Sequence, residues 1–336
     1  MIEDLNTPPP PQFSVRTEIL NLIDQISQTV IGQPELIRGI VTGLLCEGHV
    51  LIEGVPGLAK TTAVAVFAEA VDCNFSRLQF TPDLLPSDVI GSEIYRPQQN
   101  CFEVQRGPIF SNLILVDEIN RAPAKVQSAL LEAMQERQVS IGGNTLPLPT
   151  PFMVLATQNP IDQHGTYALP EAQLDRFLIK ILVQYPDRTA EQEILRRWLQ
   201  PTPATSTASP SVESHGRLAP VKIQQARAEI RQLNFSAELQ GYVLDVVAAT
   251  RNPTRFNARL GDFIRFGVSP RGSLALAQVA RVHAYLQSRD YVTPDDIKDV
   301  SRTVLRHRLV LSYEALAEEM TADDVLTSLL DQVPVP

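Results

Sequence analysis

Apolar residues follow two patterns along this chain, continuous runs up to about residue 184 and helical stripes beyond it. Short runs rich in β-branched residues are typical of buried parallel strands. Together with a more polar segment near 74–80, these runs predict five strands, at 50–52, 74–80, 113–116, 152–157 and 178–183. Helical spacing lies between them and before the first, from about Thr17. The alternation predicts an α/β domain with a parallel five-stranded sheet flanked by helices.

Two segments inside this domain alternate apolar and polar residues on either side of a polar turn. They span about 92–106 and 138–149, and each predicts a β-hairpin. Long connections within a compact domain are usually functional. We therefore expect the two hairpins to contact another molecule, with surface decoration as the simpler alternative.

The C-terminal part shows helical periodicity alone. Two predicted helices carry apolar stripes, Leu239, Tyr242, Val243, Val246 and Val247 on one and Leu274, Ala277, Val282 and Leu286 on the other. Ser269 and Thr293 are each followed by a proline, a sequence typical of an N-cap residue before a proline at the first helical position. We predict a Pro-rich flexible tail over 1–12, the α/β domain over 13–184 and an all-helical domain over 185–336, with a flexible loop at about 200–218.

The first strand leads into a predicted phosphate-binding loop. Glycine lets the backbone fold closely around phosphates, which the loop N–H groups and the positive end of the next helix attract. Lys60 can reach the β- and γ-phosphates, and the Thr61 hydroxyl can bind Mg²⁺. Ala59 stands where the common motif has glycine, and a Gly-Pro turn before a buried helix is the alternative interpretation. The candidate nucleotide-binding residues are Gly54, Pro56, Gly57, Leu58, Ala59, Lys60, Thr61 and Thr62.

Polar residues follow the third and fourth central runs. Asp117 and Glu118 end one strand, and Asn159 follows the next. In phosphate-loop enzymes the first acid holds Mg²⁺ and the second polarises the attacking water. The carboxyl ends of parallel strands meet at one edge, where open sheets bind ligands. The pattern predicts ATP or ADP with Mg²⁺, bound by Thr61 and Asp117, and catalysis by Lys60 and Glu118.

Arg271 stands in the first turn of a predicted helix, after the Ser269-Pro270 start. The helix dipole disfavours a cation at this end, so the arginine suggests an anionic partner. The alternative is an arginine that faces solvent, at a cost of only a few tenths of a kcal/mol.

Composition narrows the class of protein. The chain has 336 residues and a formal net charge of −9, with no Lys/Arg-rich run, which disfavours non-specific nucleic-acid binding. Cys46, Cys73 and Cys101 are widely spaced, as in the reduced thiols of a cytoplasmic protein. We expect no secretory leader and no membrane span, since the start is acidic and no apolar run approaches about 20 residues.

With these parts in order, the chain resembles the MoxR family of AAA+ ATPases, the clade that also holds the magnesium-chelatase ATPase subunit. The resemblance extends from about Val30 to Arg308. Members of the family commonly have alanine at the position of Ala59. Five motifs carry the resemblance: GVPGLAKT at 54–61, VDEINRA at 116–122, ATQNP at 156–160, PEAQLDRF at 170–177 and SPR at 269–271. The resemblance implies the AAA+ fold with a helical lid domain, and the hairpins correspond to its helix-2 and pre-sensor-1 inserts.

The resemblance also implies residue roles. Asn159 looks like sensor 1, which positions the lytic water, and Arg176 looks like an arginine finger, which acts on ATP bound to the neighbouring subunit. Arg271 resembles the sensor 2 arginine, which contacts phosphate from the lid. Ile31 and Gly32 fall in a segment that lines the adenine pocket in related ATPases, and Arg121 is a further candidate for inter-subunit contact. A surface ion pair with Asp175 or another acid is the plain alternative for Arg176.

The implied function is a cytoplasmic, Mg-dependent ATPase that forms a hexameric ring. Such proteins are associated with chaperone-like remodelling, maturation or metal insertion of partner proteins, beside a von Willebrand factor A domain protein. A nucleic-acid motor related to helicase rings is one alternative, against which the acidic composition stands. A nucleotide-gated scaffold without hydrolysis is another, against which the full set of candidate catalytic residues stands.

Overall fold

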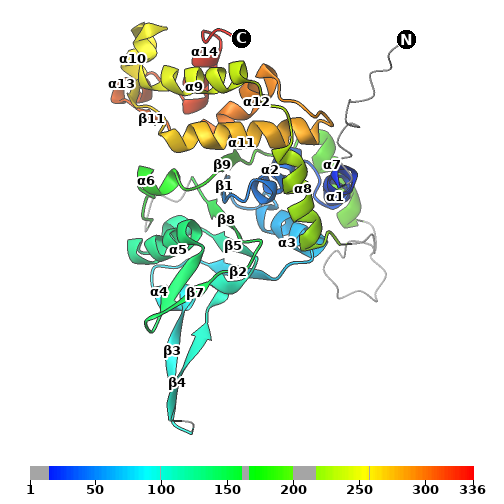
Figure 1. Cartoon of the computed structure of the whole chain (residues 1–336), viewed down its shortest axis with the longest axis vertical. Helices are drawn as coiled ribbons and strands as arrows, with labels where there is room; N and C mark the ends of the chain where they lie inside the picture. Colours follow the sequence, from blue (N-terminus) through cyan, green and yellow to red (C-terminus); the bar gives the residue numbers. More distant parts are fainter. Residues whose placement is uncertain (1–14, 99, 161–165, 200–216, 257) are drawn as a thin grey trace, which may run out of the picture.

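The chain forms a parallel sheet between two layers of helices, with a second group of helices beyond one edge of the sheet (Figure 1). The computed structural model describes residues 15–98, 100–160, 166–199, 217–256 and 258–336. The predicted tail at 1–12 and nearly all of the predicted loop at about 200–218 lie outside these residues.

The sheet has five parallel strands in the order β2-β5-β8-β1-β9. Their bounds are β1 Val50–Glu53, β2 Phe75–Gln79, β5 Leu113–Asp117, β8 Met153–Gln158 and β9 Ile179–Leu182. All five coincide with predicted strands, so the predicted fold class is confirmed. In the parallel register Gln79 lies beside Asp117 and Glu53 beside Gln158, which brings the carboxyl ends of the strands together.

The central strands are apolar up to their polar carboxyl ends because helices cover both faces of the sheet. On β5, Leu113 and Leu115 belong to one buried cluster, and the alternate residues Ile114 and Val116 belong to another. The first cluster includes residues of α1 Arg16–Thr29, α2 Pro34–Leu45 and α3 Lys60–Ala70 and continues into the C-terminal helices. The second is covered by α4 Pro86–Ile90, α5 Ala124–Glu136 and the short 3-10 helices Pro108–Phe110 and Ile119–Arg121.

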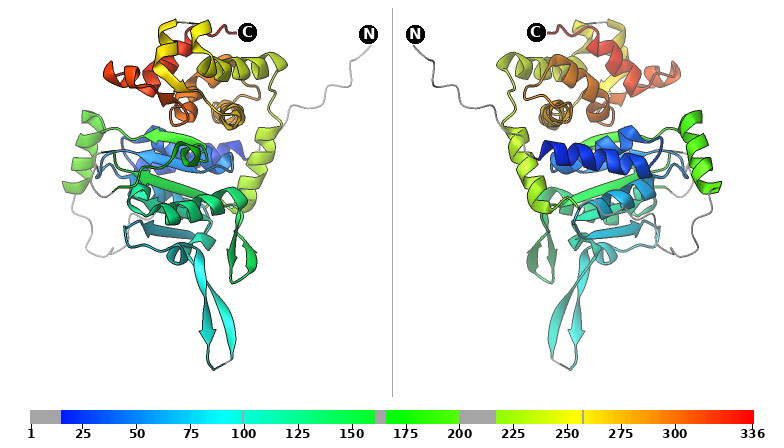
Figure 2. Two further views of the ribbon diagram at one scale, coloured as in Figure 1. Left: turned by 90° about the vertical axis from the view of Figure 1, so that its left-hand side faces the viewer. Right: turned by 90° about the vertical axis from the view of Figure 1, so that its right-hand side faces the viewer.

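Both predicted hairpins are present. They pair β3 Gly91–Arg96 with β4 Cys101–Arg106, and β6 Gln138–Ile141 with β7 Asn144–Pro147. The second turns at Gly142 and Gly143, whose positive φ angles of 57° and 81° suit a two-residue hairpin loop. The β3–β4 hairpin projects from the end of the molecule opposite to the C-terminal helices (Figure 2).

The C-terminal helices pack together as a lid beyond the edge strand β9 (Figures 1 and 2). They are α9 Ala237–Arg251, α10 Ala258–Phe263, α11 Pro270–Leu286, α12 Pro294–Leu305, α13 Tyr313–Ala317 and α14 Ala322–Leu330, with a 3-10 helix Pro253–Arg255. As predicted, Ser269 and Thr293 cap their helices through their hydroxyls.

Two details of the lid differ from the prediction. It contains a short antiparallel pair, β10 Ile264–Phe266 with β11 Val310–Leu311, where only helices are expected. Strands of two or three residues are too short to show a period in the sequence. The stripe assigned to α11 is also wrong at Leu274, which is 69% exposed, because the helix buries the neighbouring residues Ala275 and Leu276.

Helices α7 Arg188–Leu199 and α8 Pro220–Arg231 follow the sheet domain and lie on opposite sides of the molecule (Figure 2). Helix α7 lies near α1, since Arg197 donates to the Gln28 carbonyl. Helix α8 contacts both α2 and α11, so it joins the two parts of the molecule. Leu218, which the prediction places in the flexible loop, is buried and pairs with Val71. Across the described ranges, the helices are too short or too polar to cross a lipid bilayer.

Candidate nucleotide site

The phosphate loop connects β1 to α3, which begins at Lys60. Gly57 has a φ of +86°, a conformation that favours glycine. Gly54 is needed for a different reason, because a Cβ there would lie 2.9 Å from the Val183 carbonyl oxygen. Gly57 therefore permits the turn of the loop, and Gly54 permits close packing of the loop against the end of β9.

Ala59 adopts the left-handed conformation, with a φ of +56°. This conformation costs a non-glycine residue about 1–2 kcal/mol, which explains why the common motif has glycine here. Glycine in turn loses about 0.5–1 kcal/mol more conformational freedom on folding. We therefore expect Ala59→Gly to raise the free energy of unfolding by about 0.5 kcal/mol, measured by urea denaturation.

A matched control for this prediction is Ala65→Gly in the middle of α3. Ala65 has ordinary helical geometry, so its replacement is expected to lower the free energy of unfolding by about 1 kcal/mol. Equal destabilisation by the two substitutions would contradict the assignment of strain to Ala59.

A cavity of about 420 Å³ opens above the phosphate loop at the carboxyl edge of the sheet. Residues from the loop, from β2 and from the ends of β5 and β8 line it: Pro56, Gly57, Ala59, Lys60, Thr61, Thr62, Arg77, Gln79, Asp117, Glu118, Thr157 and Asn159. The structure thus brings most of the predicted loop residues together with both acids and Asn159. Leu58 is buried in the core instead and does not line the cavity.

Asp117 is held by two neighbours that sequence reasoning missed. Its Oδ2 accepts a 2.7 Å hydrogen bond from Arg77 Nε, which comes from the adjacent strand β2. Its Oδ1 accepts a bond of 3.3 Å from the hydroxyl of Thr157, at the end of β8. The hydroxyl and carboxylate oxygens of Thr61 and Asp117 are ligands that Mg²⁺ prefers. Since both residues line this cavity, they fit a bound Mg²⁺.

Glu118 occupies a strained position at the end of β5. Its backbone is left-handed, with a φ of +57°, and such strain in a non-glycine residue is common at functional sites. Its amide donates to Thr157 Oγ1 at 3.0 Å, and its Oε2 accepts from Gln79 Nε2 at 2.7 Å. Arg121 lies 3.2 Å from the same oxygen. In this chain Arg121 therefore pairs with Glu118, whereas the resemblance makes it a candidate for contact between subunits.

Lys60 extends back across the phosphate loop, where its ammonium group donates to the Gly54 carbonyl. Burial lowers the pKa of Lys60, and the charges of Asp117, Glu118 and Glu53 oppose this shift. The carboxylates thus stabilise the cation that the loop needs for phosphate.

The segment predicted to line the adenine pocket forms part of a second cavity of about 230 Å³, to which Gly32 and Tyr185 contribute. Gly32 has a φ of +75°, and a Cβ there would lie 2.8 Å from the Pro186 side chain. Gln33 donates to the Gln184 carbonyl at 3.1 Å. Ile31 does not line this cavity, so of the two predicted residues the structure places only Gly32 there.

Arg176 and Arg271 lie elsewhere. They line a cleft of about 550 Å³ between the sheet domain and the lid, which shares no lining residue with the phosphate-loop cavity. Arg176 donates to the Leu131 carbonyl at 2.8 Å. Among the described residues, the contacts of the Arg271 guanidinium are long, 3.5 Å to Gln135 and 3.9 Å to Asp175. Five further arginines line the cleft: Arg137, Arg227, Arg231, Arg281 and Arg308. Arg271 therefore does not line the phosphate-loop cavity of its own chain.

Sequence reasoning also missed residues whose signals are weak. Arg77 is a single cation in a short strand, and Thr157 is a single hydroxyl in an apolar one. Each looks ordinary until strand order places it beside Asp117. Gln79 is missed for the same reason, since its partner Glu118 lies 39 positions away in the chain.

Two stretches of the chain match models of known protein families. Residues 49–179 match the ATPase family associated with various cellular activities (AAA), and residues 257–329 match the AAA lid domain. Together with the phosphate loop, the paired acids and Asn159 at one sheet edge, these matches define a protein of the AAA+ class.

Relatives narrow the class further. Chaperone MoxR1 of Mycobacterium tuberculosis is 48% identical over 316 residues, which cover 94% of this chain and 81% of that protein. Protein MoxR of Paracoccus denitrificans is 32% identical, over 93% of this chain and 94% of that one. A crystal structure from Cytophaga hutchinsonii, of a protein assigned as an ATPase, has 44% identity and a TM-score of 0.87, covering 96% of both chains. The chain belongs to the MoxR family of AAA+ ATPases, as the motifs in its sequence predict.

Proposed function

We propose that this chain is a Mg-dependent ATPase whose active sites are completed between the subunits of a ring. One observation carries the proposal: the phosphate-loop cavity and the Arg176–Arg271 pair lie in separate clefts of one chain. Identical chains that contact one another through unlike surfaces form a ring when the rotations between successive subunits add up to a full turn. Such a contact places the arginines of one subunit against the nucleotide of the next, in a ring that we propose is a hexamer.

The residues of the loop cavity divide the chemistry among them. The loop amides and Lys60 bind the phosphates, and Thr61 and Asp117 hold Mg²⁺. When bound, the metal neutralises charge on the phosphate oxygens. Glu118 orients and polarises the attacking water, and Asn159 positions it near the γ-phosphate. Arg176 of the neighbouring subunit stabilises the charge of the transition state, and Arg271 reaches the same phosphates from the lid of that neighbour.

We further propose that hydrolysis drives chaperone-like remodelling or maturation, including metal insertion, of a partner protein in the cytoplasm. The relative named Chaperone MoxR1 supports this direction. The hairpin β3–β4 offers a contact surface, since it exposes the tilted rings of Tyr95 and Phe102, whose centroids lie 5.3 Å apart. A von Willebrand factor A domain protein is the partner class we propose. The nucleic-acid motor is not favoured, because the chain has a formal net charge of −9 and Arg96 of the hairpin is paired with Glu103.

The rate of ATP hydrolysis per chain is expected to rise with protein concentration, because an isolated chain lacks Arg176 of a neighbour. Phosphate release should be measured over a concentration range in which light scattering shows both monomers and assemblies. A rate per chain that does not change between monomer and assembly would contradict the shared active site. ATP binding, followed by fluorescence of a labelled nucleotide, should already occur in the monomer.

A further inference from the structure

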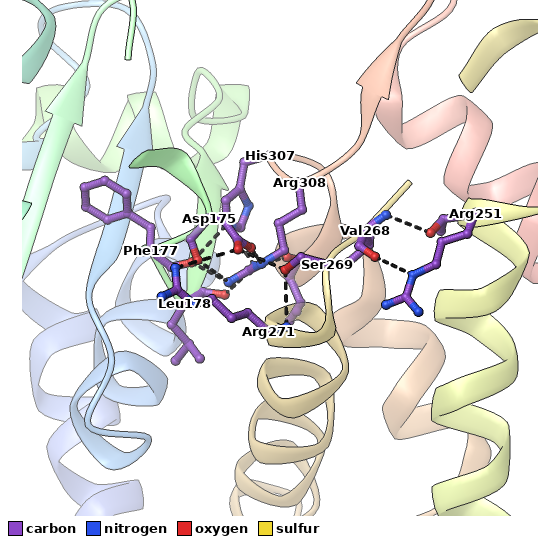
Figure 3. Close-up of polar contacts among 11 residues, drawn as sticks. Asp175, Phe177, Leu178, Arg251, Val268, Ser269, Arg271, His307 and Arg308 are labelled. Atoms are coloured by element: carbon purple, nitrogen blue, oxygen red, sulfur yellow. Dashed lines mark hydrogen bonds and ion pairs between the residues drawn. The ribbon is translucent and has the colours of Figure 1, made fainter. Parts of the chain in front are cut away.

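The loop that carries Arg176 is gripped on both sides of that residue by the lid. Arg176 follows α6 Glu171–Leu174 and the capping residue Asp175. Arg308 comes from the segment after α12 and donates from Nε to Asp175 Oδ1 at 2.9 Å and from Nη2 to the Phe177 carbonyl at 2.6 Å. Its Nη1 reaches the Leu178 carbonyl at 3.0 Å. One side chain of the lid thus holds the residues before and after Arg176 (Figure 3).

A second lid residue completes this grip. The Ser269 hydroxyl donates to Asp175 Oδ2 at 2.9 Å, so both carboxylate oxygens of Asp175 are bound by the lid. Ser269 is in turn tied to α9, because Arg251 Nε donates to the carbonyl of the preceding residue, Val268, at 2.8 Å (Figure 3). The contacts to the loop therefore involve several lid elements.

Burial makes this connection stiff. The Arg308 side chain is 3% exposed and that of Asp175 is 17% exposed. Burial lowers the pKa of Arg308 to about 10, with the nearby Asp175 charge opposing the shift, so the guanidinium remains charged near neutral pH. A buried guanidinium that loses its acceptors is strongly unfavourable. By contrast, among the described residues the half-buried Arg176 side chain donates one hydrogen bond, to the Leu131 carbonyl.

We propose that Arg308 is a positioning residue for hydrolysis: it couples the lid of one subunit to the arginine finger that the same subunit presents to its neighbour. The inference rests on the proposed inter-subunit role of Arg176 and goes beyond it, because it assigns a lid residue to control of the finger. Its consequence is that a lid displacement in one subunit moves the finger that serves the next active site. The Arg308–Asp175 pair, 133 positions apart in the chain, forms this link.

Arg308→Lys tests the proposal, because lysine keeps the charge but cannot reach several acceptors with a planar fork. A displacement of catalytic groups by about 1 Å can cost about 10²-fold in rate. We therefore expect kcat to fall by about 10- to 100-fold while the affinity for ATP stays unchanged. The matched control is Arg306→Lys, at a lid arginine whose side chain is 12% exposed and whose partner is Asp323, at 3.0 Å, rather than the finger loop. Its kcat is expected to stay close to that of the parent chain.

A mixing experiment separates positioning of the finger from general damage. Chains with Arg308→Lys keep an intact nucleotide site, and chains with Glu118→Gln keep an intact finger. Mixed in equal amounts, they are expected to regain several-fold more activity than either alone, since some Arg308→Lys sites then receive a correctly held Arg176. Asp175→Asn, which removes the carboxylate that Arg308 binds, is expected to behave in the same way and serves if Arg308→Lys does not fold.

The same mixture with Arg176→Ala in place of Arg308→Lys tests the proposed function separately. If activity recovers in the mixture with Arg176→Ala but not in those with Arg308→Lys or Asp175→Asn, the proposed role of Arg308 is wrong. The proposed role of Arg176 as an inter-subunit finger then still holds. No recovery in any mixture overturns both, because the finger would then not act between subunits. Recovery in all of them is the expected result.

Discussion

Replacing Arg176 by alanine is expected to lower kcat for ATP hydrolysis by about 10³- to 10⁵-fold, the usual worth of an arginine finger. The guanidinium lies outside the phosphate-loop cavity of its own chain, so the affinity for ATP should not change. Steady-state phosphate release and nucleotide titration on the same assembled sample measure the two quantities. Light scattering confirms that the variant still assembles.

The cleft itself provides the control for this substitution. Arg231 lines the same cleft, but its side chain is 75% exposed. Its contact with Glu47 is long, at 3.9 Å. Arg231→Ala removes an equal charge from the same surface and is expected to leave kcat within a few-fold. If Arg176→Ala were as mild as Arg231→Ala, the role of Arg176 would be the structural one of its hydrogen bond to Leu131.

Replacing Glu118 by glutamine is expected to lower kcat by about 10²- to 10⁴-fold, the range in which a positioned general base contributes. Glutamine preserves the shape of the side chain and can still accept from Gln79, so the site should remain assembled. ATP binding is expected to persist, and the variant should accumulate in the ATP-bound ring. A single-turnover measurement with labelled ATP distinguishes slow chemistry from slow release of product.

Glu132→Gln is the matched control, since Glu132 is an exposed glutamate on α5 outside the loop cavity. Its turnover is expected to match that of the parent chain. A Glu118→Gln chain that hydrolyses ATP at the parent rate would remove the assignment of Glu118 as the residue that polarises water. It would also weaken the whole paired-acid interpretation, in which Asp117 binds the metal.

The order of elements and the position of the phosphate loop could be predicted from the amino-acid sequence. Strand, phosphate loop and helix follow one another within 50–70. The two hairpins are predicted by alternating apolar and polar residues on either side of a polar turn. These signals are local, because the period of apolar residues and the backbone demands of glycine and proline act over a few positions. For the same reason Ser269 and Thr293 could be recognised as helix caps from the sequence alone.

Which of these residues contact one another depends on how the strands and domains pack. Arg77 binds Asp117 because β2 pairs with β5, and Arg176 and Arg271 share a cleft because the lid packs beyond β9. The hydrogen bond from Arg308 to Asp175 joins residues that are too far apart in the chain for a local sequence pattern to predict it. Strand order and domain packing determine such contacts, and both depend on burial and hydrogen bonding summed over the whole fold. The type of a single residue does not indicate which distant residue it will contact.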